Sequence, residues 1–169
     1  GSTIVADNGT DEFAVFNGHI WTYLTNCGNQ NADPLFEQAY PLESWGTEHI
    51  LMITIEQNDN AYRVVAKENG TTFTVNGVPT GPVLNVGDVY DGNFSNVTEA
   101  IMIESNKPCA VTQTMTTGVC SGNGDPSMIV LNSNEQMYLD TVTFYAATGG
   151  SSLTNYVNVV TRSADTSTM

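Results

Sequence analysis

Positive charge is what this chain of 169 residues has least of, since four Lys and Arg face eighteen Asp and Glu and the formal net charge is -14. Nucleic-acid-binding proteins need a cationic surface that displaces counterions from phosphate, and anionic membranes attract basic segments. The charge therefore excludes nucleic acid as a partner and argues against an anionic membrane surface. An acidic surface suits a salt-rich or calcium-rich extracellular fluid, where ions screen the repulsion between carboxylates, and we expect an extracellular or cell-surface location.

Long apolar runs are also missing. No stretch approaches the eighteen consecutive apolar residues of a membrane-spanning helix, which excludes direct membrane insertion by a helix. The chain opens with Gly-Ser, as a processed or cloned start does, so a removed signal peptide would leave no trace. The length fits one domain over residues 1–169, either complete or as a fragment of a larger repeat protein.

Sustained helical periodicity occurs nowhere, and the local patterns are those of strands. Short runs rich in Val, Ile, Thr, Phe and Tyr alternate apolar with polar residues, and Gly or Asn-Gly separates them about every ten residues. The clearest are EHILMITIEQ, AYRVVAKE, TTFTVNG, TEAIMIES, CAVTQTMT, DTVTFYAA and NYVNVVTR. Asn69-Gly70 predicts a tight hairpin between the second and third of these runs, and Asn76-Gly77 closes the next strand in the same way. The sequence predicts an all-β protein.

Two parts of the chain resemble each other. Cys27 and Cys120 are 93 residues apart, the two Asp-Pro pairs that begin at Asp33 and Asp125 are 92 apart, and strand-like runs follow both. We therefore predict an antiparallel β-sandwich-like domain of two imperfect repeats of about 93 residues, at about 27–119 and 120–169, the second incomplete. A β-propeller is the alternative, although about six strands in each repeat exceed the four of a typical blade.

An ordered set of motifs runs through most of the chain, from about residue 27 to residue 162: YPLESWGTEHI, YRVVAKENGTTFTVNG, LNVGDVY, IMIESNKPCAVTQTM and GDPSMIVLNSNEQMYLDTVTFY. This order resembles the amino-terminal domain of IgGFc-binding protein and its bacterial and invertebrate relatives. The resemblance implies a secreted, β-rich module of large mucin-like or adhesin-like proteins, and no catalyst. It does not by itself imply antibody binding, because the family has no residue signature for that property that could be transferred to this sequence.

Catalytic motifs are absent from the sequence. There is no Gly-x-Ser-x-Gly elbow, no phosphate-binding glycine loop and no His-Glu-x-x-His helix. His19 and His49 both lie in strand-like runs, where a structural imidazole is more common than a catalytic one. We therefore expect no enzyme activity; an enzyme would require a deep polar pocket with two carboxylates or a perturbed histidine.

Oxygen-rich loops leave calcium open as a cofactor. Asp88 and Asp91 in GDVYDGN are the best candidate ligands, because calcium prefers carboxylate and carbonyl oxygens. The alternative is structural, since Asp and Asn occur in turns because they bond to their own backbone. Asp33 and Asp125 fit this second role as the first residues of Asp-Pro pairs, although loops gathered at one end of a sandwich also serve as recognition loops.

Ligand binding is predicted for the aromatic residues Trp21, Tyr23 and Trp45 and for the two Asp-Pro loops. Exposed aromatic side chains on one strand face form carbohydrate or protein platforms, whereas the alternative for each is core packing. We therefore expect the chain to be a non-catalytic adhesion or display module with a protein or glycan partner. The alternative is a structural subunit that binds copies of itself by strand addition.

The chain has three cysteines, an odd number, so they cannot all pair in disulfides within one chain. Cys109 and Cys120 flank a strand-like run, so a disulfide between the start of the strand and the following loop is expected, with Cys27 left over. The alternative is that all three are small buried apolar residues. Four Asn-x-Ser/Thr sequons are glycosylation candidates if the source has the pathway: Asn8, Asn69, Asn93 and Asn96.

Overall fold

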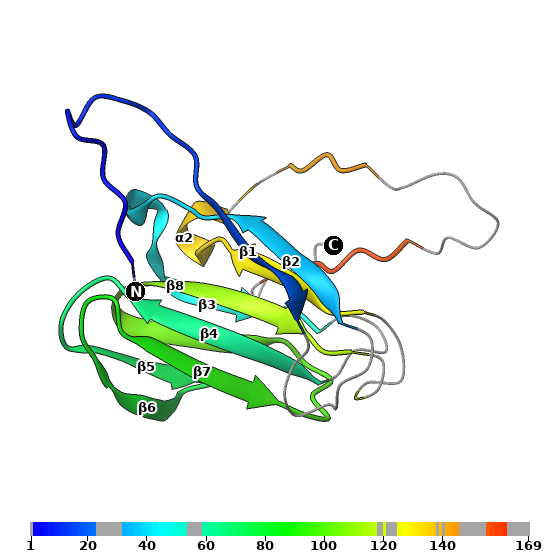
Figure 1. Ribbon diagram of the computed structural model, residues 1–169. Helices are drawn as coiled ribbons and strands as arrows, with labels where there is room; N and C mark the ends of the chain where they lie inside the picture. The colour runs from blue at the N-terminus through cyan, green and yellow to red at the C-terminus, as the bar shows by residue number, and fades with distance from the viewer. Residues whose placement is uncertain are drawn as a thin grey trace. The chain divides into compact units, whose positions relative to one another are not determined.

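The computed structural model describes residues 2–22, 32–53, 59–117, 120, 125–137, 139, 141–145 and 155–161 (Figure 1). The chain divides into two units, Gly1–Tyr138 and Leu139–Met169, which are treated separately below. The first unit contains two antiparallel sheets, one of seven strands and one of two.

Strand β8 (Ile101–Met115) is the centre of the large sheet. On one flank it pairs with β5 (Thr71–Val75) and then β4 (Asn60–Ala66), and on the other with β3 (Gly46–Leu51) and then β9 (Ser127–Leu131). Ile101, Ile103, Cys109, Val111 and Gln113 are the inward residues of β8, as the two-residue period of a strand requires. One strand therefore holds four neighbours in register.

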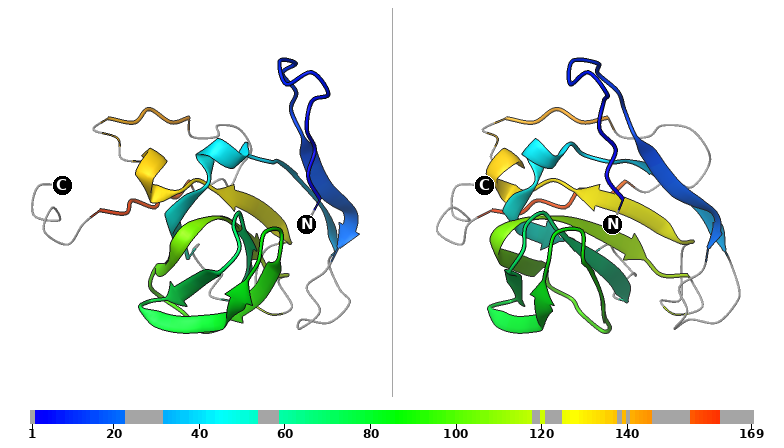
Figure 2. Two further views of the ribbon diagram at one scale, coloured as in Figure 1. Left: turned by 90° about the vertical axis from the view of Figure 1, so that its left-hand side faces the viewer. Right: turned by 60° about the vertical axis from the view of Figure 1, so that its left-hand side comes forward.

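The outer strands β6 (Val78–Leu84) and β7 (Val89–Phe94) pair with β5 and β4 respectively. The sheet thus has two halves, β3-β8-β5-β6 and β9-β8-β4-β7, and it curls so that the halves face each other, as Figure 2 shows. The predicted all-β, antiparallel class is confirmed, and the two layers of the core come from one bent sheet. The core between the halves consists of Leu51, Tyr62, Val64, Ala66, Phe73, Leu84, Ile101, Ile103, Cys109 and Val111.

The hairpin predicted at Asn69-Gly70 is wrong. β4 and β5 do not pair with each other; both run antiparallel to β8, one after the other. Gly70, with a φ of 74°, instead lies in an irregular bend that turns the chain from one half of the sheet to the other. Asn76-Gly77 does form a two-residue hairpin turn, with φ of 49° and 77°, between the paired residues Val75 and Val78.

The bend includes residues 67–70 between β4 and β5, residues 85–88 between β6 and β7, and residues 105–108 within β8, which together we call the corner. Side chains satisfy its backbone groups, because a bend interrupts the regular ladder. Asn106 accepts from Thr72 N at 2.8 Å and donates to Gly70 O at 3.2 Å, while Lys107 Nζ donates to Asn69 O at 2.5 Å. The Ser-Asn-Lys-Pro motif therefore lies within β8 and shapes the corner.

The end of the sheet where β8 finishes, which we call the open end, is held by a buried amide. Gln113 accepts a hydrogen bond from Met52 N at 3.1 Å and donates to Met52 O at 2.7 Å and to Asn60 Oδ1 at 3.1 Å. Gln113 is 2% exposed, so these bonds satisfy polar groups that water does not reach. They tie the end of β3 to the start of β4 across the core.

Two short helices complete the first unit, the 3-10 helix η2 (Leu42–Ser44) before β3 and α2 (Asn134–Met137) after β9. In the second unit, the predicted strands around 141–145 and 155–161 belong to no strand among the described residues. A segment with high strand propensity forms a sheet only when a neighbouring strand pairs with it. The two-repeat organisation therefore stays a prediction.

Candidate binding surface

The two-stranded sheet consists of β1 (Phe16–Thr22) and β2 (Asp33–Gln38), which we call the ribbon. Gly18 stands opposite Phe36, and a Cβ at Gly18 would overlap the backbone of Leu35 and Phe36. The close approach of the two backbones thus requires glycine at this position. β2 lies beside β9 without ladder pairing, so the ribbon borders the large sheet (Figure 1).

One face of the ribbon is apolar and open to solvent. Phe16 is 55% exposed, Ile20 89% and Phe36 70%. The register places Phe16 and Phe36 on the same side, and Ile20 follows within the register shift between His19 and Thr22. The rings of Phe16 and Phe36 stack with centroids 5.7 Å apart and an interplanar angle of 6°. We call Phe16, Ile20 and Phe36 the aromatic face; exposed apolar clusters of this kind mark interaction surfaces.

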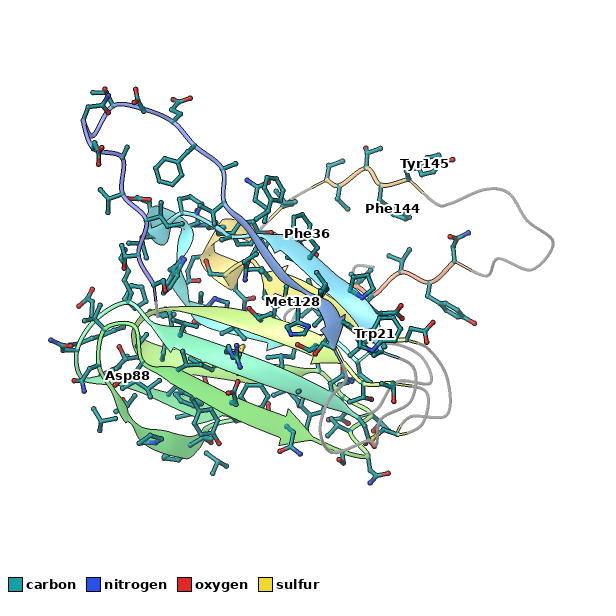
Figure 3. The ribbon with its side chains drawn as sticks, in the orientation of Figure 1. Trp21, Phe36, Asp88, Met128, Phe144 and Tyr145 are labelled. Atoms are coloured by element: carbon teal, nitrogen blue, oxygen red, sulfur yellow. The ribbon has the colours of Figure 1, made fainter. Side chains whose placement is uncertain are left out.

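Trp21 lies within the register shift of β1 and is 64% exposed. Its backbone N–H donates to His19 Nδ1 at 3.2 Å. Trp21 and Phe36 both belong to the ribbon, as Figure 3 shows. Trp21 is therefore exposed rather than packed in the core, ligand binding by Trp21 stays a prediction, and the aromatic face itself was not predicted. The signal was the alternation of apolar residues in FNGHIW beside DPLFEQ.

The two Asp-Pro loops lie at the same end of the first unit. β2 begins at Asp33, β9 begins two residues after Asp125, and both strands start at the open end (Figure 1). Thr22, next to Trp21, pairs with Asp33. The structure thus brings Trp21, Asp33 and Asp125 to one end, as a recognition-loop arrangement would require. Binding by these residues stays a prediction.

Trp45 lies elsewhere, immediately before the β3 residue that pairs with Cys109 near the corner. It is partly buried, and its indole Nε1 donates to Tyr40 O at 3.3 Å. Trp45 therefore packs against neighbouring residues and does not form part of an exposed surface. Tyr23 and Cys27 lie outside the described residues.

The two calcium candidates have structural partners. Asp88 Oδ2 accepts from Asn85 N at 2.8 Å within the turn at the corner, and Asp91 pairs with Arg63 at 2.7 Å. In Figure 3, Asp88 lies at the opposite end of the first unit from Trp21. No group of three or more His, Cys, Asp or Glu side chains suited to a metal occurs within the described part of the chain. Calcium binding at Asp88 and Asp91 stays a prediction.

The predicted Cys109–Cys120 disulfide is wrong, because Cys109 is a buried free thiol. Cys109 faces the core from the middle of β8, and six further residues of that strand span about 20 Å before it ends. Burial raises the pKa of the Cys109 thiol, against the hydrogen bond from Ser105 that lowers it. The thiol is therefore protonated and packs as an apolar side chain.

A buried histidine and a carboxylate, His49 and Glu135, interact electrostatically beside α2. Burial lowers the pKa of His49 to about 4, against the attraction of Glu135 that raises it, and His49 is 1% exposed. Glu135 instead accepts from Thr47, with its Oε1 2.8 Å from Thr47 N and 2.6 Å from Thr47 Oγ1. These residues position β3 against α2, which is a structural use of both side chains.

The four sequon asparagines are exposed. Asn8 Oδ1 accepts from Thr10 N and Asp11 N, and Asn69 Oδ1 accepts from Val86 N at 3.0 Å. Asn96 has a φ of 56° in the turn after β7, and Asn93 lies within β7. Glycosylation at these positions stays a prediction.

The curled antiparallel sheet, with an apolar ribbon beside it, defines an all-β binding module. The family whose description is IgGFc binding protein matches residues 1–169, and the chain belongs to this family. Neither among the curated proteins nor among the solved structures was a match to the chain found. No helix of the described residues is long and apolar enough to cross a membrane.

Proposed function

We propose that this chain is a non-catalytic extracellular adhesion or display module of a larger secreted or cell-surface protein, and that it binds a protein partner through the aromatic face. The exposed stack of Phe16 and Phe36 carries this proposal. The family supports a binding module. The aromatic face consists of Phe and Ile, which suits an apolar protein surface better than a glycan with its many hydroxyl groups.

Charge sets the chemistry of the partner. The three cations of the described residues are engaged within the chain, Arg63 by Asp91, Lys67 by Leu42 O and Lys107 by Asn69 O. The formal charge of -14 leaves an excess of carboxylates over the chain, and Asp33 and Glu37 lie on β2 of the ribbon. A partner with an apolar centre and a basic rim is complementary to such a surface.

Binding of the immobilised chain to immunoglobulin Fc fragment and to a glycan array tests the proposal, with Phe16→Ala and Phe36→Ala as variants and Val83→Ala as the control. Val83 is 61% exposed on β6 and lies outside the aromatic face. We expect protein binding to fall about 30-fold in each Phe variant, as for a central interface residue. Binding that both Phe variants retain, or binding confined to glycans, would contradict the proposal.

A second candidate function is self-association by strand addition, as in a fibre or surface assembly. The observation that favours it is the exposure of apolar residues in the two strand-like runs of the second unit. Val142 is 67% exposed, Phe144 60% and Val159 65%. An exposed strand-like run is a template for pairing with another chain.

A further inference from the structure

Charged residues are unevenly spread along the chain. The stretches 13–32 and 141–161 contain no Asp, Glu, Lys or Arg, although the chain has 22 such residues in all. The first stretch includes all of β1, and the second includes both strand-like runs of the second unit. Two copies of this acidic chain repel each other everywhere except where uncharged stretches meet.

The outer strands of the first unit differ in how well their edges are protected against pairing with a further strand. β6 contains Pro79 and Pro82, which lack an N–H, and β7 carries Asp91. The backbone N–H of Thr47 on β3 is already bonded to Glu135. Proline, charge and capping are the usual protections of a sheet edge.

β1 lacks proline and charge, and its stretch 16–19 pairs regularly with β2; the Trp21 N–H is bonded to His19 Nδ1 beside the register shift between His19 and Thr22. β1 is seven residues long and pairs only with β2 among the described residues. Both of its faces are exposed. An edge of this kind is the one that β-strand addition uses.

Residues 141–145 have the alternation of a strand that could fill this edge. Val142 and Phe144 point to one side of such a strand and Thr141 and Thr143 to the other. Val142 and Phe144 are exposed in the second unit. Their apolar side matches Phe16 and Ile20 on β1.

We propose that the outer edge of β1 accepts residues 141–145 of a second copy of this chain as an added strand. Gly18, in the middle of β1, offers no side chain, so the ring of Phe144 can cover it as an aromatic residue covers glycine in an edge strand. The added strand continues the apolar row of Phe16 and Ile20 with Val142 and Phe144. Self-association therefore enlarges the aromatic face, and this inference rests on the second candidate function.

Light scattering of the purified chain as a function of concentration tests the proposal, with Ile20→Lys and Phe144→Glu as variants. Both side chains are exposed, so neither substitution disturbs the core. We expect the wild type to form dimers or larger species, more so at high salt because salt screens the charge of -14. Each variant should raise the dissociation constant about tenfold or more.

Mixing the two variants gives the decisive result. In the mixture the unchanged β1 edge of the Phe144→Glu chain meets the unchanged segment 141–145 of the Ile20→Lys chain, so mixed dimers should form. Val83→Lys and Val86→Glu are matched controls at exposed apolar residues outside the proposed pairing, and they should associate like the wild type.

A wild type that stays monomeric at every concentration and salt level would overturn the proposal, and so would controls that dissociate like the variants or a mixture that stays monomeric. Pairing within one chain would likewise leave the mass monomeric. Partner binding by the aromatic face is measured separately with Phe16→Ala and Phe36→Ala. A negative result for self-association therefore does not count against the proposed partner binding.

Discussion

The carboxylate of Glu135 in α2 holds Thr47 at the start of β3 by both the backbone N–H, at 2.8 Å, and the hydroxyl, at 2.6 Å. Gly46 leaves room for this contact, because a Cβ there would overlap Ser133 and Glu135. The short helix α2 is thereby fastened to a strand 88 residues earlier in the chain.

We expect Glu135→Ala to destabilise the first unit by about 1–2 kcal/mol, the contribution of two charge-assisted hydrogen bonds at an exposed site. Burial raises the pKa of Glu135, but the hydrogen bonds from Thr47 outweigh it and lower the pKa to about 2. Because the folded pKa lies below the unfolded value, this stabilisation is present above about pH 4.5 and is lost as the pH falls through about 2. Urea unfolding of the wild type and of Glu135→Ala at several pH values measures the difference in their free energies of unfolding. A constant difference between them from pH 6 to pH 2 would contradict it.

His49 gives a second pH dependence in a different window. The pKa of His49, about 4 in the folded chain, lies below the ordinary histidine value of 6.5, so the unfolded chain binds the proton first as the pH falls. The free energy of unfolding should therefore fall by about 3 kcal/mol as the pH drops from 6.5 to 4, and then level off. His49→Leu should remove this slope, as measured by urea unfolding, while His19→Leu, at an exposed position, should retain it. An unchanged slope in His49→Leu would exclude His49 as its source.

Gln113→Leu should cost about 3 kcal/mol of stability. The leucine fills a similar volume but leaves Met52 N, Met52 O and Asn60 Oδ1 without the hydrogen bonds that Gln113 provides. Chemical denaturation measures the loss, and Gln38→Leu at an exposed position of β2 is the matched control. Equal stability of the two variants would show that the buried amide does not tie the halves together.

Thiol labelling should distinguish the cysteines by their reactivity. Cys109 is free and buried, so alkylation without reductant should modify it only after unfolding, while Cys120, which is disulfide-bonded, should stay unmodified. Reduction before labelling should expose all three thiols of the chain. Mass spectrometry of peptides counts the labels, and labelling of Cys109 in the folded protein would contradict its burial.

The fold class followed from the sequence because strand alternation and turn residues are local signals. Asn76-Gly77 formed the predicted hairpin, whereas Asn69-Gly70, with the same letters, formed a bend in the corner. An Asn-Gly pair specifies positive φ but not which strand the next residues will meet. That choice is made by β8, which pairs with both β4 and β5.

The site was harder to predict for a related reason. Phe16 and Phe36 have the pattern of core residues, and only the absence of a covering layer in the described structure leaves them exposed. Trp45 has the same chemistry as Trp21 but packs beside Tyr40. Burial depends on the tertiary neighbours of a strand, which alternation alone does not reveal.

The central place of β8 also has a consequence for how the chain reaches its fold. Leu51 pairs with Ile101, which is 50 residues later in the chain, and Asn60 pairs with Met115, which is 55 residues later. So high a contact order puts folding in the range of milliseconds to seconds. During synthesis, the first hundred residues therefore cannot complete the large sheet, and the uncharged β1 edge is present before β8 is made. A chaperone, or rapid release of the complete chain, would have to keep that edge from pairing too early.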